Sequence, residues 1–133
     1  MALTIADTLV TPVNGQTINS AATYTSAETD VGANALVESP IMFVDVTGFA
    51  STVGGNARLV VSVLPVHTTS GTAYGSAPMP MTYNLPCTDA AYSWTVALPL
   101  LPRFYKVTVL NDTNQNTDVS AVTVRIAYRK VTV

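Results

Sequence analysis

The sequence predicts an all-β protein, a two-sheet antiparallel β-sandwich or jelly roll of about eight strands. Threonine and valine, the β-branched residues that fit a pleated sheet, are the most frequent residues in the chain. Good helix formers are scarce, and no window of a dozen residues places apolar side chains at helical spacing. Short alternating segments separated by turn residues fill the chain instead. With 133 residues and no linker composition, residues 1–133 are expected to form one domain.

Eight segments carry strand patterns, and Pro, Gly and Asn residues bound them. They cover residues 4–13, 16–26, 41–47, 58–66, 79–85, 92–98, 104–110 and 118–133. The last is the clearest, because Val122, Val124, Ile126 and Tyr128 alternate with polar or small residues, as in a strand with one solvated face. Segment 58–66 is almost continuously apolar, which predicts that both of its faces are covered.

Turn chemistry places the remaining boundaries. Asn14-Gly15 predicts a tight hairpin between the first two strands. Pro80 interrupts segment 79–85 and favours an edge position for it. Gly32 limits any helix between residues 27 and 37 to a single turn. Residues 1–13 alternate poorly, so they are expected to form an extended N-terminal arm or an edge strand.

Composition excludes several classes of function. Charged residues make up 11% and apolar residues 48% of the chain, the opposite of a disordered protein. A net charge of −2 disfavours nucleic-acid binding, which normally shows a basic excess. The N-terminus lacks the pattern of a secretory signal, and no apolar stretch is long enough to span a membrane. We therefore expect a soluble protein made in the cytoplasm.

The candidate catalytic residues form no set typical of an enzyme. His67 is the single histidine and follows an apolar strand, so a nucleophile would have one base available to it. Cys87 is the single cysteine, cannot form an internal disulfide, and has no electropositive neighbours in sequence. The acidic residues of the first half could include a carboxylate pair for glycoside hydrolysis. They are Glu28, Asp30, Glu38 and Asp45.

Asp45 stands out because it interrupts an apolar run. Pointing inward, it would need a partner such as Arg58 or Arg125, since an unpaired buried charge is costly. Pointing outward, it would be an ordinary strand charge. An outward position or a structural ion pair is favoured, and no enzyme activity is expected.

Two further patterns suggest binding sites. Residues 112–118 carry oxygen-bearing side chains at alternate positions, like the start of a calcium loop, but Thr117 and Thr123 stand where glycine and glutamate are required. An Asn-rich hairpin loop accounts for them equally well, and no metal or cofactor is expected. Trp94, with Tyr92, Phe104 and Tyr105, could form a sugar-stacking platform, although core packing is favoured because Trp94 alternates with apolar residues.

Basic residues gather near the C-terminus. Arg125, Arg129 and Lys130 could contact nucleic acid or an acidic partner. Charges along a strand also prevent edge-to-edge aggregation, which is the favoured interpretation. The glycine-rich segment at residues 54–56 has no lysine and so does not predict a phosphate-binding loop.

Three segments taken together resemble a known family. They are Thr25-Ser26-Ala27-Glu28-Thr29-Asp30, Phe43-Val44-Asp45-Val46-Thr47, and Leu101-Pro102-Arg103-Phe104-Tyr105-Lys106-Val107-Thr108-Val109. With the long alternating strand at the C-terminus, they resemble the β-sandwich decoration (cement) proteins of tailed bacteriophage capsids. The resemblance covers most of the chain but rests on strand patterns.

That resemblance implies a structural virion protein on the capsid surface. Such a protein, commonly a homotrimer, binds the major capsid protein and stabilises the head by bridging capsid subunits. Candidate contact residues lie in the N-terminal arm and in the loop from residue 68 to residue 80. They are Leu3, Ile5, Leu9, Val10, Tyr74, Met79 and Met81. The alternative is a carbohydrate-binding module of a phage tail or fibre, with Trp94 in the site.

Overall fold

The computed structural model describes residues 2–49, 57–66, 80–86, 91–112 and 119–133. The candidate residues His67, Tyr74, Met79 and Cys87 lie outside these ranges, as do residues 113–118 of the predicted hairpin loop. Within them every regular element is a β-strand and every strand pairing is antiparallel, so the all-β prediction is confirmed. No helix long and apolar enough to cross a membrane occurs among the described residues.

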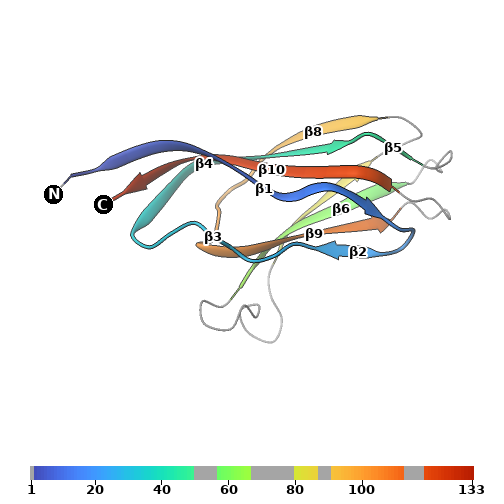
Figure 1. Ribbon diagram of the computed structural model, residues 1–133, viewed down its shortest axis with the longest axis horizontal. Helices are drawn as coiled ribbons and strands as arrows, with labels where there is room; N and C mark the ends of the chain where they lie inside the picture. The colour runs from blue at the N-terminus through green and yellow to red at the C-terminus, as the bar shows by residue number, and fades with distance from the viewer. Residues whose placement is uncertain (1, 50–56, 67–79, 87–90, 113–118) are drawn as a thin grey trace.

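Two sheets form the domain (Figure 1). Sheet A contains β1 (Thr4–Ile18), β10 (Val119–Thr132), β4 (Ala35–Val46) and β8 (Tyr92–Ala97) in that order, with β5 (Gly48–Phe49) also paired to β10. Sheet B contains β2 (Thr23–Thr25), β9 (Phe104–Asp112), β6 (Arg58–Pro65) and β7 (Met81–Pro86), with β3 (Thr29–Asp30) also paired to β9. The position of β7 confirms the predicted edge strand.

The strand order is that of a jelly roll. Strands β2 and β3 pair with the same neighbour, as do β4 and β5, so each couple is one strand with an interruption. Counted in this way, the described residues form the predicted eight strands. Their order is 1-8-3-6 in sheet A and 2-7-4-5 in sheet B, which is the jelly-roll arrangement.

The core lies between the sheets, where alternate residues of each strand point inward. From sheet A it takes Val13, Met42, Val44, Val122, Val124 and Ile126, and from sheet B Leu59, Val61, Val63, Tyr105, Val107 and Val109. The alternation predicted for the last strand is confirmed. Strand β6 differs from prediction, because Val60 and Leu64 on its outer face are half-buried rather than covered. A continuous apolar run does not distinguish a covered face from a half-exposed one.

The predicted hairpin at Asn14-Gly15 is wrong. Strand β1 continues through these residues, and Gly15, with a φ of 63°, sits among three register shifts between Val10 and Ile18. Its N–H donates a hydrogen bond to Thr123 Oγ1 at 3.1 Å. The turn comes later, where Ala22 N–H donates to Asn19 C=O. Asn-Gly allows a bulge as readily as a two-residue turn, since both need a positive φ.

Sheet A extends past sheet B at one end. Its three longest strands have 15, 14 and 12 residues, whereas the longest strand of sheet B has 9. Figure 1 shows both chain termini at this end, beside the start of β4. Residues 4–10 therefore form an edge strand of the sheet rather than a detached arm. We call this part of the molecule the terminal end.

Candidate functional site

The terminal end carries the exposed apolar surface of the described chain. Six large apolar side chains are more than half exposed, and all of them lie there: Leu3, Ile5, Leu9, Leu36, Leu100 and Val133. Ile5 and Leu9 belong to β1 and Leu3 directly precedes it, while Leu36 lies near the start of β4 and Leu100 belongs to the connection between β8 and β9. We call these six residues the terminal patch. A concentration of exposed apolar side chains at one end of a protein is typical of an interaction site.

The register of sheet A sets the order of side chains on its outer face. Ile5, Val131 and Leu36 lie opposite one another in one row across β1, β10 and β4. The next row holds Asp7, Arg129 and Glu38, and the following row returns to apolar residues with Leu9, Ala127 and Ile41. The face therefore alternates apolar and charged rows.

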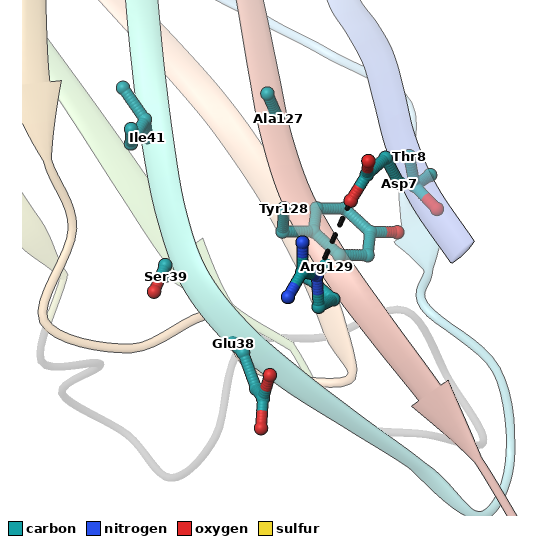
Figure 2. Close-up of a pocket in the computed structure, with 8 residues that line it drawn as sticks. All are labelled: Asp7, Thr8, Glu38, Ser39, Ile41, Ala127, Tyr128 and Arg129. Carbon is teal, nitrogen blue, oxygen red and sulfur yellow. Dashed lines mark hydrogen bonds and ion pairs between the residues drawn. The ribbon is translucent and has the colours of Figure 1, made fainter. Parts of the chain in front are cut away.

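A bulge shapes the middle of this face. Between Glu38 and Ile41, two residues of β4 lie opposite the single residue Tyr128, and Ser39 has a φ of 51°. Such a bulge bends the strand locally. It borders a pocket of about 380 Å³ between β1, β10 and β4, in which Arg129 lies 3.5 Å from Asp7 (Figure 2). Both charged side chains are exposed, so this ion pair contributes little stability.

A second pocket of about 400 Å³ lies at the same end. Leu36 and Leu100 line it, together with Pro40, Pro99 and Leu101. One wall is the turn after β3, where Asp30 accepts hydrogen bonds from Arg103 Nε at 3.1 Å and Gly32 N–H at 2.8 Å. The Arg103 guanidinium, and then the Gly32 N–H, hold the pKa of the Asp30 carboxyl below its usual range.

The backbone conformation at position 32 of this wall favours glycine. Its φ is 115°, and a Cβ there would lie 2.8 Å from the Lys130 Nζ. The wall of the second pocket is therefore a defined turn, fixed by a glycine and by an ion pair.

Farther along the outer face, Asp45 takes part in a structural ion pair. Arg125 donates a hydrogen bond to it at 2.7 Å and Ser93 donates another at 2.7 Å. The guanidinium also lies over the Phe43 ring, 5.7 Å from its centroid. Asp45 thus points outward and is held by one of the two arginines that the sequence suggested as partners.

The other acidic residues are not brought together. Asp30 pairs with Arg103, and Glu38 lies in the row with Arg129. No group of three or more His, Cys, Asp or Glu side chains in the described ranges could hold a metal ion. Asp112, the first residue of the predicted ion loop, forms an ion pair with Arg58 at 2.7 Å.

The aromatic residues do not form one exposed platform. Phe104 and Tyr105 are buried, while Tyr92 and Trp94 are half-buried and stack on each other with ring centroids 5.2 Å apart. Trp94 also packs against the core. The basic residues separate in the same way, since Arg125 and Arg129 each pair with an aspartate and Lys130 approaches Gly32.

The sequence-predicted contact residues divide into two groups within the described part of the chain, from which Tyr74 and Met79 are absent. Leu3, Ile5 and Leu9 belong to the terminal patch, whereas Val10 and Met81 are half-buried and pack against the core. Leu36, Leu100 and Val133 were missed, because their exposure depends on strand register and on the bulge. A signal was present in Pro99-Leu100-Leu101, where apolar residues follow directly after the end of a strand.

Comparisons with known proteins found distant similarities to solved structures. No known protein family and no curated protein matches the sequence. The chain is similar to a solved protein of Bacillus endospore appendages, described as disulfide-linked pili, with 18% identity and a TM-score of 0.48 over 96% of this chain and 90% of that one. It is similar to a chain of infectious bursal disease virus strain Gx, with 11% identity and a TM-score of 0.46 over 96% and 37% of the two chains.

A third similarity is to the enzymatically active domain of tailspike protein 4 of bacteriophage CBA120. Identity is 12% and the TM-score 0.37, over 96% of this chain and 19% of that one. These similarities are too distant for a shared activity to follow.

Proposed function

We propose that this protein is a structural virion protein, a decoration protein that binds the outside of a phage head and bridges capsid subunits. The observation that supports the proposal is the terminal patch, which gathers six exposed apolar side chains at one end of the sandwich, beside two pockets. The family resemblance of the sequence supplies the partner, the major capsid protein. The protein acts through contact and transforms no molecule.

Stabilisation of the head would follow from mass action. A protein that binds the assembled shell more tightly than its separate subunits shifts the equilibrium toward the shell. We propose a homotrimer, because capsids offer three-fold sites and several linked contacts reinforce one another through effective concentration. An attachment of roughly 1,600 Å² in total is of ordinary size for a specific interface.

Attachment to purified, undecorated heads of the parent phage tests the proposal. Co-sedimentation is measured for the wild type, for Leu36→Asp with Leu100→Asp, and for Thr95→Asp as a control on the exposed face of β8. The double variant should bind at least about tenfold more weakly, because it places two charges in a contact where a few central residues carry most of the binding energy. The control should bind like the wild type.

Two results would overturn the proposal. One is absence of wild-type binding to the heads, and the other is equal loss of binding in the double variant and the Thr95→Asp control. Each variant should first show the thermal unfolding of the wild type.

A further inference from the structure

Strand β1 offers a regular, unpaired edge at the terminal end. Its register with β10 is continuous from Thr4–Thr132 to Val10–Ile126, and the bulges and Pro12 come only afterwards. Among the described residues, no strand pairs with the other side of β1. Natural edge strands usually carry lysines, prolines or bulges that block further pairing. Residues 4–10 carry none of these and hold one charged side chain, Asp7.

The register also shows where the backbone groups of β1 point. Val133 N–H donates to Asn34 C=O at 3.3 Å, so the odd-numbered residues at this end of β10 face β4 and the even-numbered ones face β1. Even-numbered residues of β1 lie opposite even-numbered residues of β10, as in Thr4–Thr132. The backbone N–H and C=O groups that point to the unpaired edge are therefore those of Ile5, Asp7 and Leu9.

We propose that this edge pairs antiparallel with the β1 edge of a second copy, about a two-fold axis through Ala6. In this register Leu3 lies opposite Leu9 of the other copy, and Ile5 lies opposite its Asp7. The backbone groups that point outward from β1 in one copy then form hydrogen-bonded pairs with those of the other copy. The inference rests on the proposed function, for which it supplies a contact between neighbouring copies on the shell.

Charge and side-chain matching select that register. An axis through Asp7 would place two carboxylates directly opposite each other, which is destabilising. An axis through Ile5 leaves Leu9 unpaired, and an axis through Thr8 leaves Leu3 outside the regular stretch. The axis through Ala6 uses all of residues 3–9 and covers apolar side chains that are 64%, 63% and 59% exposed at Leu3, Ile5 and Leu9.

The occupant is a second copy because the segment is complementary to itself. In a two-fold contact, if residue i of one copy contacts residue j of the other, then residue j of the first copy also contacts residue i of the second. Here this places Leu3 opposite Leu9 at both ends of the paired segment. One strand pair covers less area than a stable dimer needs, so the contact is weak in dilute solution. On a shell, neighbouring three-fold sites are related by two-folds, and the high effective concentration there strengthens such a contact.

Disulfide trapping detects even a weak contact and reads its register. Even-numbered residues of β1 would form non-hydrogen-bonded pairs, whose Cα atoms lie about 4.5 Å apart, within the range that a disulfide bridges. In a Cys87→Ser background, which removes the only native cysteine, Ala6→Cys should give a covalent dimer on oxidation. Thr8→Cys is the matched control, because it would face Thr4 and not itself.

Mixing two different cysteine variants provides a second test of the same register. Thr4→Cys and Thr8→Cys proteins should cross-link to each other and each much less to itself. Dimer is measured on non-reducing gels, after the reduced variants have been shown to unfold at the wild-type temperature. Self-linking of Thr8→Cys equal to that of Ala6→Cys would overturn the register.

Two other results would overturn the pairing itself. One is that Ala6→Cys stays monomeric at concentrations near those on a shell, with no product from the Thr4→Cys and Thr8→Cys mixture. The other is preferred cross-linking of Ala6→Cys to Thr95→Cys on the edge strand β8, which would indicate head-to-tail contact. Attachment of the reduced variants to heads is measured separately. Attachment without cross-linking overturns only this inference, and cross-linking without attachment overturns only the proposed function.

Discussion

Replacing Tyr105 with phenylalanine should stabilise the protein near neutral pH. Tyr105 lies near the start of β9 with 0% exposure, and its hydroxyl has no hydrogen-bond partner of ordinary geometry among the described residues. A buried polar group without a partner costs about 1–3 kcal/mol. Phenylalanine keeps the ring and removes that cost, while leaving a small gap. We expect a gain of about 1 kcal/mol in the free energy of unfolding.

The same substitution should change the response to high pH. Burial raises the pKa of Tyr105 well above its usual range, and nearby Tyr128 raises it further, while Thr29 opposes this only weakly. Above about pH 10 the unfolded chain loses the phenolic proton and the folded chain keeps it. The unfolded state then binds fewer protons, so wild-type stability falls as pH rises.

Urea unfolding at pH 8 and pH 11 measures both effects. Tyr105→Phe should be more stable at pH 8 and should lose less stability at pH 11 than the wild type does. The variant should still lose some stability at pH 11, because burial also raises the pKa of Tyr128. Tyr83→Phe, at a half-buried tyrosine on β7, controls for loss of a hydroxyl. A destabilisation of more than about 1 kcal/mol at pH 8, or an unchanged pH dependence, would refute the reasoning.

Four other predictions concern the core, the outer face, the N-terminal segment and residues 112–118. Ile126→Ala should lower the free energy of unfolding by about 2–5 kcal/mol in urea titrations, and a loss below 1 kcal/mol would contradict its central packing. Asp45→Asn should lower the free energy of unfolding by about 1 kcal/mol or less, because its ion pair with Arg125 is partly exposed. The loss should be smaller in about 0.5 M salt, where the Debye length falls to about 4 Å and the pair is screened. A loss above about 3 kcal/mol would indicate a buried pair. Deleting residues 1–11 should weaken attachment to heads while circular dichroism still shows cooperative unfolding, because Val13 and the core remain; unchanged attachment would exclude this segment from the contact. Calcium should leave the melting temperature unchanged, and a rise would indicate an ion bound at residues 112–118.

Much of the fold could be predicted because sheet patterns are local. The alternation of Val122, Val124 and Ile126 requires one buried face, and the structure buries all three. Pro80 correctly indicated an edge strand, since proline cannot donate to a neighbouring strand. These conclusions need only the neighbouring residues of one segment.

Other features depend on partners distant in sequence. The start of β4 at Ala35 was missed because Pro40 interrupts its pattern, and only the bulge opposite Tyr128 keeps both halves in one strand. The terminal patch has the same origin, since the register of β10 places Leu36 in one row with Ile5. Of its six residues, the sequence-predicted contact set contains Leu3, Ile5 and Leu9, which lie at the start of the chain.

Electron cryo-microscopy of heads decorated with the wild-type protein tests the central claim most directly. The account predicts density for the sandwich on the outer capsid surface, with Leu36 and Leu100 turned toward the capsid subunits. Density in which that end faces solvent, or heads that carry no added density at saturating protein, would contradict it.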